Sequence, residues 1–270
     1  MEKDPKVWLR ELRRSHDLLS KFAETLGPDD VRRTSYCDEW SVAQVLSHLG
    51  SGAEIFSLIL AAALSGSEPP DREGFQAVWD RWDAKDPDRQ RIDFQASDAA
   101  LLDALESIED QLGSIEITAM GRQMDMAEFL GMRLGEHALH AWDVAVTFDP
   151  AAVVDAPAVE LLIDRIPALG PALGRPATDV AGAPQRVVVA TVDPIRAYTF
   201  DIGAAVTVAE VARDADSEPT RADLRLPAEA LLRFVYGRLD AGHAPPLDPV
   251  DDARSATAIV DMLRATYPGF

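Results

Sequence analysis

The stretch GMRLGEHALHAWDVAV, residues 131–146, decides the fold of the first half of the chain. It lies in a predicted helix of about 125 to 148, where apolar residues recur with helical periodicity. Glu136, His137 and His140 interrupt this apolar pattern. Burying such ionisable groups costs several kcal/mol unless they are paired. We therefore expect them either to pair with one another or to hold a ligand together.

The spacing of the glutamate and the second histidine suits a metal ion. Glu136 and His140 are four residues apart and share one helix face, as metal ligands do in helical bundles. A catalytic zinc site takes three protein ligands and leaves one position open. His48, in the helical segment VLSHLGSG, is the predicted third ligand. His16 lies on a charged helix and His243 in a Gly/Pro-rich loop, so neither is expected to contribute.

The neighbouring polar residues have weaker predicted roles. His137 continues an apolar stripe and is expected to pack or to support a ligand from behind. Asp143 is a candidate carboxylate behind the ligands. The alternative without metal is a buried Glu–His pair.

Helical patterns fill the rest of the N-terminal half. Residues 5–26 carry apolar groups at helical spacing, and Ser41 is placed to cap a second helix that continues to about residue 64. The charged segment 72–113 is broken at Asp86-Pro87, and residues 114–120 resemble a short strand. We expect an all-helical domain over residues 1–150.

Beyond Pro150 the pattern changes to mixed helix and strand. One helix is predicted first, then β-branched segments between turn residues, then two helices that close the chain. The predicted segments are a helix at 156–169, strands at 185–192, 196–202, 204–212 and 221–226, and helices at 227–239 and 252–267. Pro227 suits the first turn of its helix. The predicted fold class is therefore α+β, with a smaller α+β domain over 151–270.

Composition excludes several classes of partner. The chain has 26 Lys and Arg against 46 Asp and Glu, a formal net charge of −20. Such a charge repels phosphate backbones and anionic lipid, so we expect no nucleic acid and no membrane partner. The one cysteine, Cys37, is expected to be buried and inert, and it fits a reducing cytoplasm. The N-terminus does not look like a signal peptide, and the apolar run 55–64 is too short to span a bilayer.

Two motifs carry a family resemblance. In CDEWSVAQVLSHLGSGAEIF, residues 37–56, a Trp shortly precedes a helix with a His-Leu pair, and residues 131–146 contain Glu-x-x-x-His-Ala-Trp-Asp. In this order they resemble the mycothiol-dependent maleylpyruvate isomerase family, within the wider group of DinB-like metal-binding proteins. The resemblance implies a DinB-like N-terminal four-helix bundle. It also implies a C-terminal α+β domain related to sterol-carrier proteins, to which the strands and LLRFVYGRLD are similar.

The resemblance also implies a chemistry. It implies a divalent metal, usually zinc, on His48, Glu136 and His140, and mycothiol as the thiol cofactor. A thiol held by zinc loses its proton, and the thiolate attacks a small electrophilic substrate. The outcome is isomerisation or S-transfer. In the family an arginine of the C-terminal domain is thought to serve the site, and Arg238 is our candidate for a substrate carboxylate. The alternative is a surface arginine that caps a helix ending at Leu239.

Two other classes of function stay open at this point. One is a non-catalytic protein that binds a small apolar ligand and whose metal is structural or vestigial. The other is a metal-dependent hydrolase, in which water takes the open position and Asp143 or His137 is the general base.

Overall fold

The computed structural model describes residues 3–119, 121–176, 185–211, 222–245 and 253–269, with no account of the side chains of 253–255. Residues 120, 212, 221 and 252, at the ends of predicted elements, lie outside the described residues. Contacts divide the chain into two compact units, Glu2–Ala152 and Val153–Phe270.

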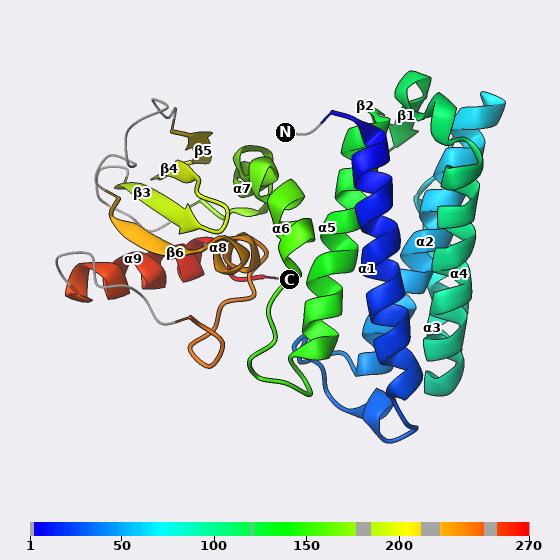
Figure 1. Cartoon of the computed structure of the whole chain (residues 1–270), viewed down its shortest axis with the longest axis horizontal. Coiled ribbons are helices and arrows are strands. Elements are labelled where there is room, and N and C mark those ends of the chain that lie inside the picture. The colour runs from blue at the N-terminus through cyan, green and yellow to red at the C-terminus, as the bar shows by residue number, and fades with distance from the viewer. Residues whose placement is uncertain (1–2, 120, 177–184, 212–221, 246–252, 270) are drawn as a thin grey trace. The chain divides into compact units, whose positions relative to one another are not determined.

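Four long helices that run side by side make up most of the first unit (Figure 1). They are α1 (Pro5–Thr25), α2 (Val42–Ser65), α4 (Pro87–Ser107) and α5 (Met126–Ala145). Helix α1 packs against α4 and α5, and α2 packs against the same two helices. The unit also contains the shorter α3 (Arg72–Asp83) on α2, 3₁₀ turns at Asp30–Arg32 and Glu109–Ser114, and strands β1 (Glu116–Ala119) and β2 (Arg122–Asp125).

The helix boundaries follow from capping residues. Ser41 accepts a hydrogen bond from the Gln44 amide while the Gln44 side chain accepts one from the Ser41 amide, a capping box at the start of α2. Gly66 ends α2 in the left-handed conformation, with φ of 68°. Asp86 caps α4, whose first residue is Pro87, so the predicted break is confirmed there. The predicted strand at 114–120 is one arm of a β1–β2 hairpin whose second arm was not predicted.

Helix α2 is the most apolar helix of the first unit and belongs to its core. By length and composition alone Val42–Ser65 could cross a membrane, but 67% of its most apolar 18-residue window is buried inside the fold. The apolar run predicted at 55–64 is therefore only part of a longer apolar helix. The surrounding helices cover most of this helix.

Gly50 lets α2 approach its neighbours closely. A Cβ added there would lie 2.3 Å from the Trp82 ring and 2.9 Å from the Cα of Phe94 on α4. We expect Gly50→Ala to lower the free energy of unfolding by about 1–3 kcal/mol through overpacking, although alanine favours helix. Urea unfolding measures this, with Gly113→Ala as control because a Cβ there meets no atom within 4 Å. Equal stability of wild type and Gly50→Ala would contradict this packing.

The second unit is built on a four-stranded sheet of order β5-β4-β3-β6. Its strands are β3 (Gln185–Val192), β4 (Ala197–Ile202), β5 (Val206–Glu210) and β6 (Leu224–Pro227). The β3–β4 and β4–β5 pairs are antiparallel and the β3–β6 pair is parallel. Helices α6 (Ala156–Leu162), α7 (Ile166–Leu173), α8 (Ala228–Val235) and α9 (Ala253–Thr266) complete the unit, with a 3₁₀ turn at Ile163–Arg165. Helix α7 packs on β5, and α8 packs on β3 and β6.

The structure confirms the α+β fold class and corrects three details of the second unit. The predicted helix at 156–169 is two helices, because Pro167 lacks an amide hydrogen and its ring excludes a continuous helix. Pro227 lies at the N-cap of α8 rather than in its first turn. Helix α8 ends at Val235 and not at Leu239, because Gly237 follows with a positive φ of 72°.

Candidate metal centre

The structure brings together the three residues predicted as metal ligands. His48 comes from α2, while Glu136 and His140 lie one turn apart on α5. The Nε2 atoms of His48 and His140 lie 3.1 Å and 3.7 Å from Oε2 of Glu136. One ligand atom from each residue lies within 4.8 Å of the other two. Capping of α2 at Ser41 and packing of α2 on α5 fix this arrangement.

The expectation that these groups are all buried is wrong. The side chain of His140 is 10% exposed, but that of His48 is 33% exposed and that of Glu136 is 43% exposed. The cluster therefore lies at the edge of the bundle, with His140 on its inner side. A ligand can approach it from solvent past Glu136 and His48.

For Glu136 and His48, the electrostatics favour the protonation states that bind metal. Burial disfavours the charged form of Glu136, but hydrogen bonds from His140 and His48 hold its pKa well below the usual range. Burial lowers the pKa of His48, which outweighs the opposite effect of its hydrogen bond to Glu136. A carboxylate and neutral imidazoles are the ligand forms of these side chains.

The donor set fits a catalytic metal ion. Two imidazole nitrogens and one carboxylate oxygen form the three-ligand set of several catalytic zinc sites, where the fourth position is open. A hydrogen-bonded Glu–His pair explains the contacts of Glu136 with one histidine. It does not explain why a second imidazole from another helix converges on the same carboxylate oxygen.

A carboxylate orients His140 from behind. Oδ2 of Asp143 lies 2.8 Å from Nδ1 of His140, which leaves Nε2 facing Glu136. The same oxygen accepts a hydrogen bond from the Cys37 thiol at 3.3 Å. Cys37 is half-buried rather than fully buried. The sequence pattern had indicated Asp143 for this position.

Asp143 provides a test of that orientation. We expect Asp143→Asn to weaken zinc binding about 10- to 100-fold, because an amide accepts the imidazole N–H less strongly and can rotate its own donor toward it. Titration with zinc in a competing chelator measures the affinity. Asp240→Asn, which removes a partner of His243 in the second unit, is the control. Equal zinc affinity of Asp143→Asn and wild type would contradict the orienting role.

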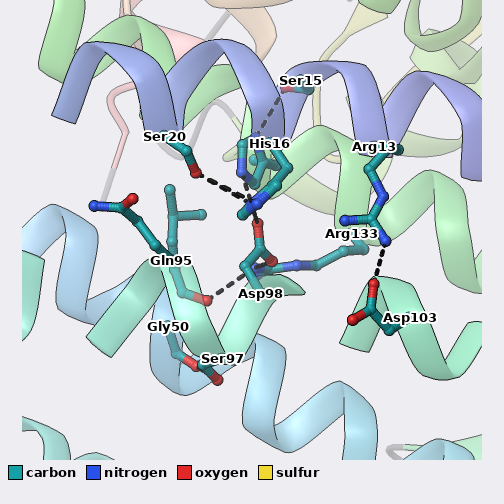
Figure 2. A network of polar contacts seen from close by, with 12 residues as sticks. Arg13, Ser15, His16, Ser20, Gly50, Gln95, Ser97, Asp98, Asp103 and Arg133 are labelled. Atoms are coloured by element: carbon teal, nitrogen blue, oxygen red, sulfur yellow. Dashed lines mark hydrogen bonds and ion pairs between the residues drawn. The ribbon is translucent and has the colours of Figure 1, made fainter. Parts of the chain in front are cut away.

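A second polar cluster lies deeper in the bundle, around Asp98 of α4 (Figure 2). Nδ1 of His16 lies 2.9 Å and Nε2 of His137 3.0 Å from Oδ2 of Asp98, and Arg133 donates to Oδ1 at 2.6 Å. All four residues are buried. His16, predicted only as a residue of a charged helix, is buried as well, because the carboxylate of α4 gives the imidazole a partner inside the core.

This cluster holds helices of the bundle together and does not include the predicted metal ligands. His137 also bonds Ser15 on α1, at 2.9 Å through Nδ1. Arg133 donates to the carbonyl of Leu49, the residue after His48, and so ties α5 to α2. Ser15 and Asp98 therefore lie beside the two ring nitrogens of His137, as expected for a supporting residue. Arg133 braces the two helices that carry the predicted ligands.

Arg238 lies in the second unit, just beyond α8. Its guanidinium is buried, with the residue 5% exposed, and donates to the Tyr236 carbonyl at 3.0 Å. The alternative of a surface arginine that caps a helix ending at Leu239 is therefore wrong in its details. The arginine is buried, and the carbonyl it binds belongs to the C-cap residue of α8.

Comparison with known proteins gives consistent results. Residues 12–145 match the family described as mycothiol maleylpyruvate isomerase N-terminal domain. Crystal structures of the mycothiol-dependent maleylpyruvate isomerase and of a histidine-to-alanine mutant of it share the fold, each with a TM-score of 0.60. They are 19% and 18% identical to this chain, and each match covers 91% of it and 96% of the solved chain. No protein of curated function matches by sequence.

Proposed function

The chain belongs to the mycothiol-dependent maleylpyruvate isomerase family, and from this premise we propose a metal-dependent, thiol-using enzyme. In this proposal His48, Glu136 and His140 hold a divalent ion, with zinc as the expected metal. Mycothiol is the cofactor, and the substrate is a small electrophile that undergoes isomerisation or S-transfer. The observation that carries the proposal is the convergence of two imidazoles from two helices on one carboxylate at the bundle edge.

The ion, when bound, would stabilise a thiolate over a thiol and so supply a nucleophile at neutral pH. The protein residues prepare the site for it. Glu136 supplies a negative charge and His48 a neutral nitrogen, while Asp143 fixes the direction of His140. Arg133 and the Leu49 carbonyl hold the two ligand-bearing helices together. Because Glu136 and His48 are partly exposed, a thiol and a substrate can reach the cluster.

The geometry gives less support to hydrolysis. Of the two general bases considered, His137 is fully buried and bonded to Ser15 and Asp98. Asp143 is also fully buried and bonded to His140. Their burial withholds both groups from a water molecule that reaches the cluster from solvent. The solved structures that share the fold are of an isomerase, which supports an enzyme over a purely ligand-binding protein.

Two parts of the proposal concern the rest of the chain. We keep Arg238 as the candidate for a substrate carboxylate, with residues 151–270 as the domain that supplies it. Its bond to the Tyr236 carbonyl would orient the guanidinium for such a role. The single cysteine and the low-molecular-weight thiol both fit a reducing cytoplasm, which we propose as its location.

Metal content and thiol dependence together test the proposal. Protein purified without chelator is expected to contain about one divalent ion per chain by elemental analysis. After removal of the ion by a chelator, turnover of an electrophile should require both added zinc and added mycothiol. Turnover with zinc but without any thiol would indicate hydrolysis instead. A protein that takes up no zinc would contradict the proposal.

A further inference from the structure

Cys37, His140 and Asp143 form a second group of metal-ligand side chains beside the candidate metal centre. One ligand atom from each residue lies within 4.8 Å of the other two. The Cys37 thiol donates to Oδ2 of Asp143 at 3.3 Å, and Nδ1 of His140 lies 2.8 Å from the same oxygen. The other ring nitrogen of His140, Nε2, is the one that faces Glu136. The group therefore uses the edge of the imidazole that the candidate metal centre leaves unused.

The backbone holds the Cys37 thiol against α5. The Cys37 carbonyl accepts from the Trp40 amide at 2.7 Å and from the Ser35 hydroxyl at 3.1 Å. The Tyr36 amide donates to the backbone carbonyl of Asp143 at 3.3 Å. The turn that carries the thiol is thus tied to the same residue whose carboxylate accepts from it. Asp143 is fully buried and Cys37 is half-buried, so an ion can enter the group from the cysteine side.

We propose that Cys37, His140 and Asp143 form a second, inhibitory site that binds a soft metal ion such as cadmium. A thiolate selects soft ions, whereas the proposed zinc site contains no sulfur ligand. Binding releases the thiol proton to solvent, and the thiolate and the Asp143 carboxylate then bring two negative charges to the ion. The binding needs neither His48 nor a thiol cofactor, and so it does not depend on the proposed function.

The inhibition follows because the two sites compete for His140, and this part rests on the proposed function. A neutral imidazole has one N–H and one nitrogen lone pair, so an ion on Nδ1 places the proton on Nε2. Nε2 then presents a donor to Glu136 and no lone pair to zinc. Zinc would keep only His48 and Glu136, and the loss of one ligand corresponds to about 100-fold in affinity. Zinc must weaken the binding of the soft ion by the same factor.

Cadmium titration of the chelator-treated chain tests the site, because a cadmium–thiolate bond gives an ultraviolet charge-transfer band. We expect the band in the wild type and its absence in Cys37→Ser. In His140→Ala the affinity read from the band should fall about 100-fold. His48→Ala is the matched control, because it removes a histidine of the proposed zinc site and leaves all three residues of this group in place. It should keep the wild-type affinity for cadmium.

Other outcomes would overturn the inference. Absence of the band in the wild type would show that the thiol takes no soft ion. Equal cadmium affinity of His140→Ala and wild type would show that Cys37 binds cadmium without the group. Zinc that binds the cadmium-loaded chain as tightly as the free chain would contradict the competition for His140. A wild type that shows the cadmium–thiolate band but takes up no zinc would support the second site while contradicting the proposed function.

Discussion

Asp98→Asn is expected to lower the free energy of unfolding by about 3–5 kcal/mol, which is the cost of breaking a buried ion pair on one side. The side chains of Asp98 and Arg133 are 0% and 2% exposed, and their charged atoms lie 2.6 Å apart. Without the carboxylate, the guanidinium of Arg133 stays buried and keeps the neutral Leu49 carbonyl as an acceptor in place of a charged partner. His16 and His137 would lose the same acceptor. Urea unfolding at neutral pH measures the difference.

The loss of stability in Asp98→Asn should depend on pH in a direction that the pKa of Asp98 determines. Burial opposes ionisation of Asp98, but the charge of Arg133 and the hydrogen bonds from His137 and His16 hold its pKa well below the usual range. A lowered pKa in the folded state adds stability above the unfolded value of about 3.9, and this stability is lost as the pH falls below it. The difference between wild type and Asp98→Asn should therefore be full at neutral pH and shrink in acid.

Asp103→Asn is the matched control. Asp103 lies on the same helix and contacts Arg13 at 2.6 Å, but its side chain is 72% exposed. Exposed pairs of this kind contribute about 0–1 kcal/mol. If both variants lost the same small amount, the cluster at Asp98 would be no more than a solvated ion pair. The bundle would then not depend on it.

Much of the fold was predictable because its determinants are local. Ser41 with Gln44, Asp86 with Pro87 and Gly66 each satisfy or interrupt backbone hydrogen bonds within a few residues. Apolar periodicity then assigns the long helices, and β-branched runs assign the strands of the second unit. The juxtaposition of the proposed ligands Glu136 and His140 on α5 was predictable for the same reason, since residues four apart share a helix face.

The remaining features depend on partners that are distant in the sequence. The burial of His16 could not be predicted, because its partner, Asp98, lies 82 residues away on a helix of ordinary amphipathic pattern. The acceptors of Arg133, the Asp98 carboxylate on α4 and the Leu49 carbonyl on α2, are likewise distant from it in the sequence. The exposure of Glu136 depends on where α5 meets the edge of the bundle, and a helical pattern does not specify that edge. The Trp40 ring contacts the His48 ring only when the turn that contains Trp40 has folded.

His48→Ala is expected to abolish stable zinc binding and thiol-dependent turnover while the protein stays folded. Structural zinc sites, which have four protein ligands, bind zinc with roughly 10–16 kcal/mol. One such ligand therefore contributes on the order of 3 kcal/mol, or about 100-fold in affinity. His48 is the one proposed ligand from α2, so Glu136 and His140 on α5 would be left as a two-ligand site. The side chain is one-third exposed, and its truncation removes little from the core. Elemental analysis, a zinc titration and circular dichroism measure these three properties.

His243→Ala is the control for general effects of removing a histidine, because His243 pairs with Asp240 in the second unit and is not one of the proposed ligands. It should retain zinc and turnover. If His48→Ala bound zinc as tightly as wild type, Glu136 and His140 would be only a hydrogen-bonded pair and the metal would lie elsewhere. If His48→Ala lost zinc but kept thiol-dependent turnover, the thiolate would be generated without the ion. The convergence of α2 and α5 on Glu136 would then serve metal storage or structure rather than catalysis.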